Sequence, residues 1–148
     1  MKRILIATDG SPAATEAVHM GLEVAREEGA DVTFVHVLPP DEWQHGTRGT
    51  ALRPIVHPVA IDETETALDE AATAAGRAGV SFDRILVAGG TVDVILDAAE
   101  RADADLIVVG SRGQGTVRSA LLGSTSLGLL RRSERSVLLV RGPRDGAG

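Results

Sequence analysis

The residues best suited to chemistry are glycines and hydroxyl-bearing side chains gathered in two short segments, 110–116 and 123–126. Glycine lets the backbone approach a ligand without a Cβ clash, and successive N–H groups can form a concave anion site. Serine and threonine add hydroxyl donors, and an arginine adds a charge-assisted donor. These residue types suit phosphate binding. The candidates are Gly110, Ser111, Arg112, Gly113, Gly115, Thr116, Gly123, Ser124 and Thr125.

Ser124 stands where a helix is expected to begin. A helix N-terminus presents free N–H donors and the positive end of the helix dipole, and both attract anions. A flexible glycine-rich connection followed by an ordinary helix cap explains the same residues. Spacing alone does not separate these two interpretations.

Another candidate lies near the N-terminus, where Thr8 and Asp9 follow a short apolar segment. A carboxylate at a strand end can hydrogen-bond a ribose or help to coordinate Mg²⁺. The alternative is that Asp9 is a turn residue preceding Gly10. Which interpretation holds depends on where the first strand lies in the fold.

Continuous apolar segments alternate with amphipathic helical segments along the chain. Strands are expected at Lys2–Thr8, Asp31–Leu38, Phe82–Ala88, Asp105–Val109 and Val137–Arg141. Helices are expected from Pro12, capped by Ser11, to a stop at Gly29, then at Val59–Ala78, Val92–Ala102 and from Leu121 or Ser124 to Ser133.

This alternation predicts the α/β class, with an open, doubly wound, Rossmann-like sheet of five parallel strands and helices on both faces. Such sheets bind ligands at the carboxyl ends of their strands, near the point where strand order reverses. That placement favours the functional interpretation of Asp9. The least regular segment is Pro39–Pro58, and Gly142–Gly148 is expected to be a disordered tail.

The composition of the chain argues against several functional classes. The chain has 148 residues, which suits a single domain over residues 1–141. Its net charge of −6 argues against nucleic-acid binding. The absence of cysteine excludes thiolate zinc sites, and Lys2, the only lysine, excludes a lysine-dependent phosphate loop. No segment suggests a membrane span or a signal peptide, so we expect a cytoplasmic protein.

The spacing Gly110-x2-Gly113-x9-Gly123-Ser124 resembles the nucleotide-binding motif of the universal stress protein family. Further similarity lies in the segments ILIATDGSPAATEAV, DLIVVGSRG and LLGSTSLGLLRRSERSVLLVR. One departure is Gly128 within the last expected helix, which should cost roughly 1 kcal/mol relative to alanine.

The resemblance implies an ATP-type site. Asp9 would lie on the nucleoside side, and Val37 would meet adenine through its backbone. The ribose and phosphates would be lined by Gly110, Arg112 and Gly113, and the phosphates would be held by Gly123, Ser124 and Thr125. It also implies a homodimer through the last strand, Val137–Val140, whose apolar edge would otherwise be exposed.

We therefore expect a nucleotide-dependent stress sensor or adaptor that binds ATP, ADP or AMP, without a catalytic residue and with at most slow hydrolysis. One alternative is a slow ATPase that uses Mg²⁺ held by Asp9. Another is a nucleotide-free interaction module that regulates a transporter or an enzyme.

Overall fold

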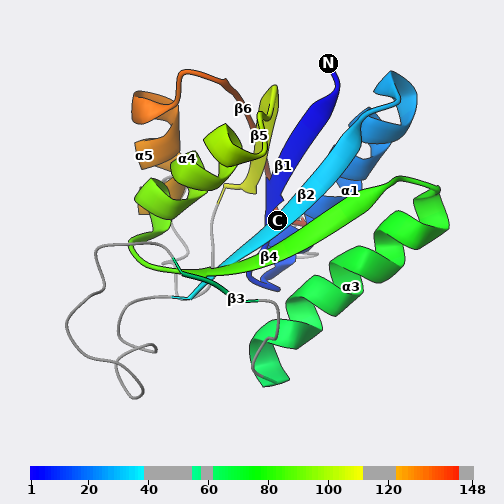
Figure 1. Cartoon of the computed structure of the whole chain (residues 1–148), viewed down its shortest axis with the longest axis horizontal. Coiled ribbons are helices and arrows are strands. Elements are labelled where there is room, and N and C mark those ends of the chain that lie inside the picture. The colour runs from blue at the N-terminus through cyan, green and yellow to red at the C-terminus, as the bar shows by residue number, and fades with distance from the viewer. Residues whose placement is uncertain (39–54, 58–61, 112–122, 144–148) are drawn as a thin grey trace.

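The computed structural model describes residues 1–38, 55–57, 62–111 and 123–143. They form one sheet with the strand order β3-β4-β2-β1-β5-β6, flanked by helices on both faces (Figure 1). The predicted sheet of five parallel strands is confirmed, and β3 adds a short antiparallel strand. The strands are β1 (Arg3–Ala7), β2 (Asp31–Leu38), β3 (Ile55–His57), β4 (Phe82–Ala88), β5 (Leu106–Gly110) and β6 (Ser136–Val140).

Sequence analysis did not predict β3, which lies inside the segment expected to be the least regular. Its three residues are enclosed by Pro54 and Pro58 and are too few to show an alternating pattern. Proline is tolerated next to an edge strand because a donor facing away from the sheet is not needed there. Pairing with β4 therefore defines this strand, not local sequence.

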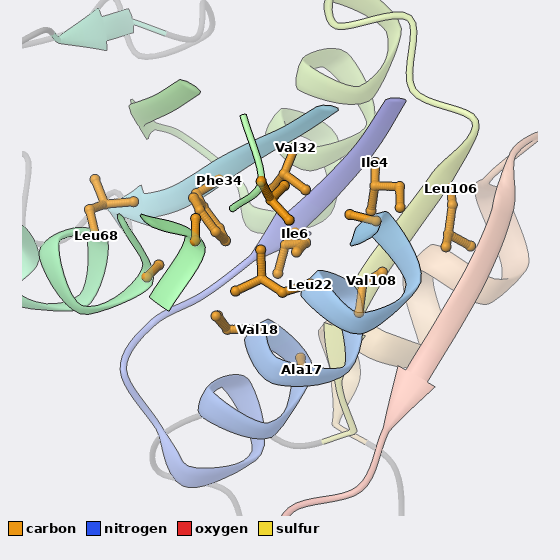
Figure 2. Close-up of a cluster of buried hydrophobic side chains, with 14 of the residues drawn as sticks. Ile4, Ile6, Ala17, Val18, Leu22, Val32, Phe34, Leu68, Leu106 and Val108 are labelled. Atoms are coloured by element: carbon orange, nitrogen blue, oxygen red, sulfur yellow. The ribbon is translucent and has the colours of Figure 1, made fainter. Parts of the chain in front are cut away.

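Each face of the sheet carries its own pair of helices and its own apolar cluster, because successive strand residues point to opposite faces. On one face, Ile6 of β1 packs with Leu22 and Leu68 from α1 and α3 (Figure 2). On the other face, Leu5 packs in a cluster with Ile95 of α4 and Leu129 of α5. The helices are α1 (Pro12–Glu28), α3 (Asp62–Ala78), α4 (Thr91–Arg101) and α5 (Ser124–Arg132).

The point where strand order reverses lies between β1 and β5. From β1 the chain proceeds outward through β2 and β4, and it then crosses to β5 and β6 on the other side. The two central strands pair in parallel, with Ile6 opposite Val108, so both end at the same edge. The turn after β1 therefore lies next to Gly110 and Ser111 at the end of β5, as the site prediction requires.

The predicted ends of α1 are confirmed. Ser11 accepts a hydrogen bond from the Ala14 N–H at 3.3 Å, and Pro12 occupies the first turn. Gly29 ends the helix in the left-handed conformation, with φ 66°. Of the two starts proposed for α5, the later one, Ser124, is correct.

Within the described part of the chain, no helix is long and apolar enough to cross a membrane.

Gly128 has a packing role that its helix propensity does not show. A Cβ built at Gly128 would lie 2.8 Å from Cγ2 of Val92, the second residue of α4. A real Cβ does not approach another carbon that closely, so glycine allows α5 to pack tightly against α4. The ion pair between Arg132 and Asp93 joins the same two helices at 2.6 Å.

The amino ends of the central strands are held together by Asp105. Its carboxylate accepts hydrogen bonds from the Lys2 N–H at 2.7 Å and the Arg3 N–H at 3.0 Å. These two backbone donors stabilise the charged form and lower the pKa of Asp105 below its ordinary value. This contact lies at the end of the sheet opposite to the candidate site.

Candidate functional site

The turn after β1 forms the first wall of the site. Thr8 is buried, and its N–H donates to the Val35 carbonyl at 2.9 Å, which extends the pairing of β1 with β2. Oγ1 of Thr8 accepts from the Gly10 N–H at 3.3 Å, and Gly10 has φ 81°, a conformation that favours glycine. Asp9 Oδ1 accepts from the Ser11 N–H at 2.9 Å. Asp9 therefore has the local turn contact that the alternative interpretation predicted, and this contact also orients its carboxylate.

The second wall is the junction between β5 and α5. The Ser111 N–H donates to the Val140 carbonyl at 2.8 Å, which continues the pairing of β5 with β6. The Ser111 carbonyl accepts from the Gly123 N–H at 2.9 Å. The Ser126 hydroxyl lies 2.9 Å from the Gly110 carbonyl oxygen and 3.2 Å from that of Ser111. The described residues of the first glycine-hydroxyl segment, Gly110 and Ser111, therefore contact the second segment.

The start of α5 has the properties of an anion site. Gly123 is its N-cap, with φ −65° and ψ 158°, and glycine has no side chain with which to cap the helix. The first helical bond runs from the Leu127 N–H to the Gly123 carbonyl, so the N–H groups before it have no partner within the helix. Ser124 is exposed and Thr125 is half-buried. This end of the helix can donate several hydrogen bonds to a negative group.

Gly110 lets α1 approach β5. A Cβ built at Gly110 would lie 2.7 Å from the carbonyl carbon of Ala13 and 2.9 Å from its oxygen. Ala13 belongs to the first turn of α1, so any larger residue at 110 would push that turn outward. Sequence analysis assigned Gly110 to the lining of the ribose and phosphates. The structure shows that it also fixes the distance between the two walls.

The remaining predicted residues divide into two groups. Val37 lies near the end of β2, opposite Val87 of β4, and is half-buried on the α4 face of the sheet. It lies at the same edge of the sheet as Thr8 and Ser111, because β2, β1 and β5 run parallel and end at that edge. The second group lies outside the described residues and consists of Arg112, Gly113, Gly115 and Thr116.

Sequence analysis placed Ser126 in the second cluster but did not select it as a site residue. It is only 3% exposed, and it shares the buried side of α5 with Leu129. The available signal was a polar residue three positions before a buried leucine, on the face of the helix that should be apolar. Buried hydroxyls require hydrogen-bond partners, so such a residue indicates a specific contact.

Comparison with known proteins agrees with this architecture. The family model described as the universal stress protein family matches residues 1–141. A universal stress protein of Thermus aquaticus is 36% identical over 141 residues, which cover 95% of this chain and 98% of that protein.

Solved structures show the same fold. A universal stress protein crystallised in complex with cAMP is 28% identical, with a TM-score of 0.72 over 96% of this chain and 98% of that one. A universal stress protein from Archaeoglobus fulgidus has a TM-score of 0.73 at 24% identity, over 95% and 98% of the two chains. The described fold and the match along nearly the whole sequence agree, and the chain belongs to the universal stress protein family.

Proposed function

We propose that this protein binds an adenine nucleotide of the ATP type at the edge between β1 and β5. The observation that carries the proposal is the start of α5, where the N-cap Gly123 has no side chain to cap the helix and where Gly123 and Ser126 are hydrogen-bonded to the end of β5. A negative group fits these N–H donors, which have no partner within the helix. The cAMP complex of a relative that is 28% identical supports an adenine nucleotide as the ligand.

We assign to each residue the role that the family resemblance implies. The phosphates would lie against the backbone of Gly123 and Ser124, with the Thr125 hydroxyl as a further donor. Asp9, held by the Ser11 N–H, would accept a hydrogen bond from the ribose. The backbone of Val37 would meet the adenine at the end of β2. Arg112, Gly113, Gly115 and Thr116 would complete the phosphate site.

In this proposal the protein acts in the cytoplasm as a nucleotide-dependent sensor or adaptor. Binding would change the surface that a target protein meets. A slow Mg²⁺-dependent hydrolysis is the second candidate. The observation that favours it is the orientation of the Asp9 carboxylate by Ser11, because Mg²⁺ bound to a nucleotide often needs only one or two protein carboxylates.

The proposed assembly is a homodimer through β6. This strand lies at the edge of the sheet, and its central residues Val137, Leu138 and Leu139 are only half-buried. Leu127 and Leu130 of the neighbouring helix α5 are 38% and 45% exposed. Unpaired apolar edges are commonly covered by another chain. Light scattering at micromolar concentration should give the mass of a dimer, and a monomer mass would overturn this assembly.

The ligand is tested by thermal unfolding with millimolar ATP, ADP or AMP, each with and without Mg²⁺. A nucleotide at about 100 times its dissociation constant should add about 2.7 kcal/mol to the free energy of unfolding. Mass analysis of any nucleotide that co-purifies would identify the natural form. Release of inorganic phosphate over hours would distinguish slow hydrolysis from simple binding.

Two glycine variants give this experiment its control. Gly123→Val places a side chain where the phosphates should lie, and its φ of −65° is one that valine adopts without strain. Gly76→Val places the same side chain on α3, where a Cβ meets nothing within 4 Å. We expect Gly123→Val to remain folded and lose the nucleotide-induced shift, and Gly76→Val to keep it. A parent protein that no nucleotide stabilises would contradict the proposal.

A further inference from the structure

Ser126 is a buried polar side chain in a position where an apolar one would be expected. It lies on the side of α5 that faces the sheet and is only 3% exposed. A serine inside a helix often bonds back to a carbonyl of its own preceding turn. Here the hydroxyl contacts a different element, the end of β5, at Gly110 and Ser111.

The contacts of Ser126 belong to a compact set of hydrogen bonds between the end of β5 and the start of α5. Within the described residues, the Ser111 carbonyl accepts from the Gly123 N–H at 2.9 Å and lies 3.2 Å from the Ser126 hydroxyl. The two lone pairs of a carbonyl can accept both bonds. The Gly110 carbonyl lies 2.9 Å from the same hydroxyl, which has one proton to share between the two carbonyls.

This set fixes the first turn of α5 relative to the carboxyl end of β5. The Ser126 side chain does so from the buried side of the helix, whereas Ser124 is exposed at its start. Ser126 therefore does not need to touch a ligand to affect it. The helical N–H groups bind an anion well only when they are held in place, because binding then loses little conformational freedom.

We infer that Ser126 is a positioning residue of the nucleotide site, which aligns the N-terminal N–H groups of α5 with the ligand's phosphates by bonding to Gly110 and Ser111. The inference rests on the proposed function for its effect on affinity. It predicts that the hydroxyl matters for ligands that carry phosphates and not for the nucleoside alone.

The test compares Ser126→Ala, Ser126→Thr and the control Ser133→Ala. Ser133, the half-buried C-cap of α5, also makes a hydroxyl contact, to the Arg135 carbonyl at 2.8 Å, at the opposite end of the helix. Binding of ATP and of adenosine is measured by calorimetry for each variant. Loss of one net hydrogen bond corresponds to a change of roughly fivefold in an equilibrium constant.

We expect Ser126→Ala to weaken ATP binding about fivefold and to leave adenosine binding unchanged. Ser126→Thr, which keeps the hydroxyl, should restore ATP binding, and Ser133→Ala should bind ATP like the parent. Equal losses for ATP and adenosine, or an equal effect of the two alanine variants, would show a general effect on stability and overturn the inference. ATP binding unchanged in Ser126→Ala would also overturn it.

Amide hydrogen exchange separates this inference from the proposed function. Ser126→Ala should speed exchange of the Gly123 N–H, which bonds to Ser111, without speeding exchange in β1. If the parent binds no nucleotide, the proposed function fails and the affinity effect fails with it. If the parent binds ATP but exchange at Gly123 is unchanged in the variant, the positioning role alone fails.

Discussion

Replacing Gly128 by alanine has two opposite effects on the free energy of unfolding, and each has a typical size. Alanine is favoured over glycine inside a helix by about 1 kcal/mol. Its Cβ would lie 2.8 Å from Cγ2 of Val92, and a β-branched valine has little freedom to turn aside. Overpacking of this kind costs about 1–3 kcal/mol. We therefore expect Gly128→Ala to lower the free energy of unfolding by about 1 kcal/mol.

Urea unfolding of four proteins measures the contact directly: the parent, Gly128→Ala, Val92→Ala and the double variant. Val92→Ala removes the obstructing methyl groups, so alanine at 128 should then stabilise the protein by about 1 kcal/mol. The coupling between the two sites should be about 2 kcal/mol. Gly76→Ala places its Cβ in open space, so it should stabilise both the parent protein and the Val92→Ala variant. If Gly128→Ala stabilises the parent as Gly76→Ala does, the close packing of α4 and α5 is refuted.

Three further changes test other contacts. Gly110→Ala should cost about 1–3 kcal/mol of stability in urea because its Cβ meets the Ala13 backbone, and unchanged stability would contradict this packing. Ser11→Ala should lower the free energy of unfolding by about 1 kcal/mol, because it removes the cap of α1. A free energy of unfolding equal to that of the parent would contradict this role. Asp105→Asn should lower the melting temperature at pH 7. Because the folded pKa of Asp105 lies below 3.8, this difference should be full above that pH and disappear as pH falls through the folded pKa, and a difference independent of pH would contradict it.

The sequence predicted those features that local rules determine. The cap and the stop of α1 followed from Ser11, Pro12 and Gly29, whose conformational preferences act within one turn. The strand β4 was predicted with its observed bounds, Phe82–Ala88, because its apolar residues 85–88 end at the Gly89-Gly90 turn. The expectation that the first strand lies where strand order reverses is confirmed, because β1 lies between β2 and β5.

What sequence reasoning missed depends on contacts between distant residues. The strand β3 exists through its pairing with β4, and three residues carry no pattern of their own. Gly128 was expected only to weaken its helix, whereas its packing role depends on Val92 of α4. Gly110 was interpreted through a ligand, but its contact with Ala13 is within the protein. Ser126 looked like part of a cluster until its partners were located.

The central claim is that the turn after β1 and the start of α5 form one nucleotide site. Backbone amide chemical shifts of ¹⁵N-labelled protein, followed while ATP is added, test it most directly. We predict that the amides of Gly10, Ser111, Ser124 and Thr125 shift together with one dissociation constant, while that of Asp105, at the opposite end of the sheet, stays in place. Shifts that are confined to another part of the sheet, or that leave Ser124 and Thr125 unchanged at saturation, would contradict the account.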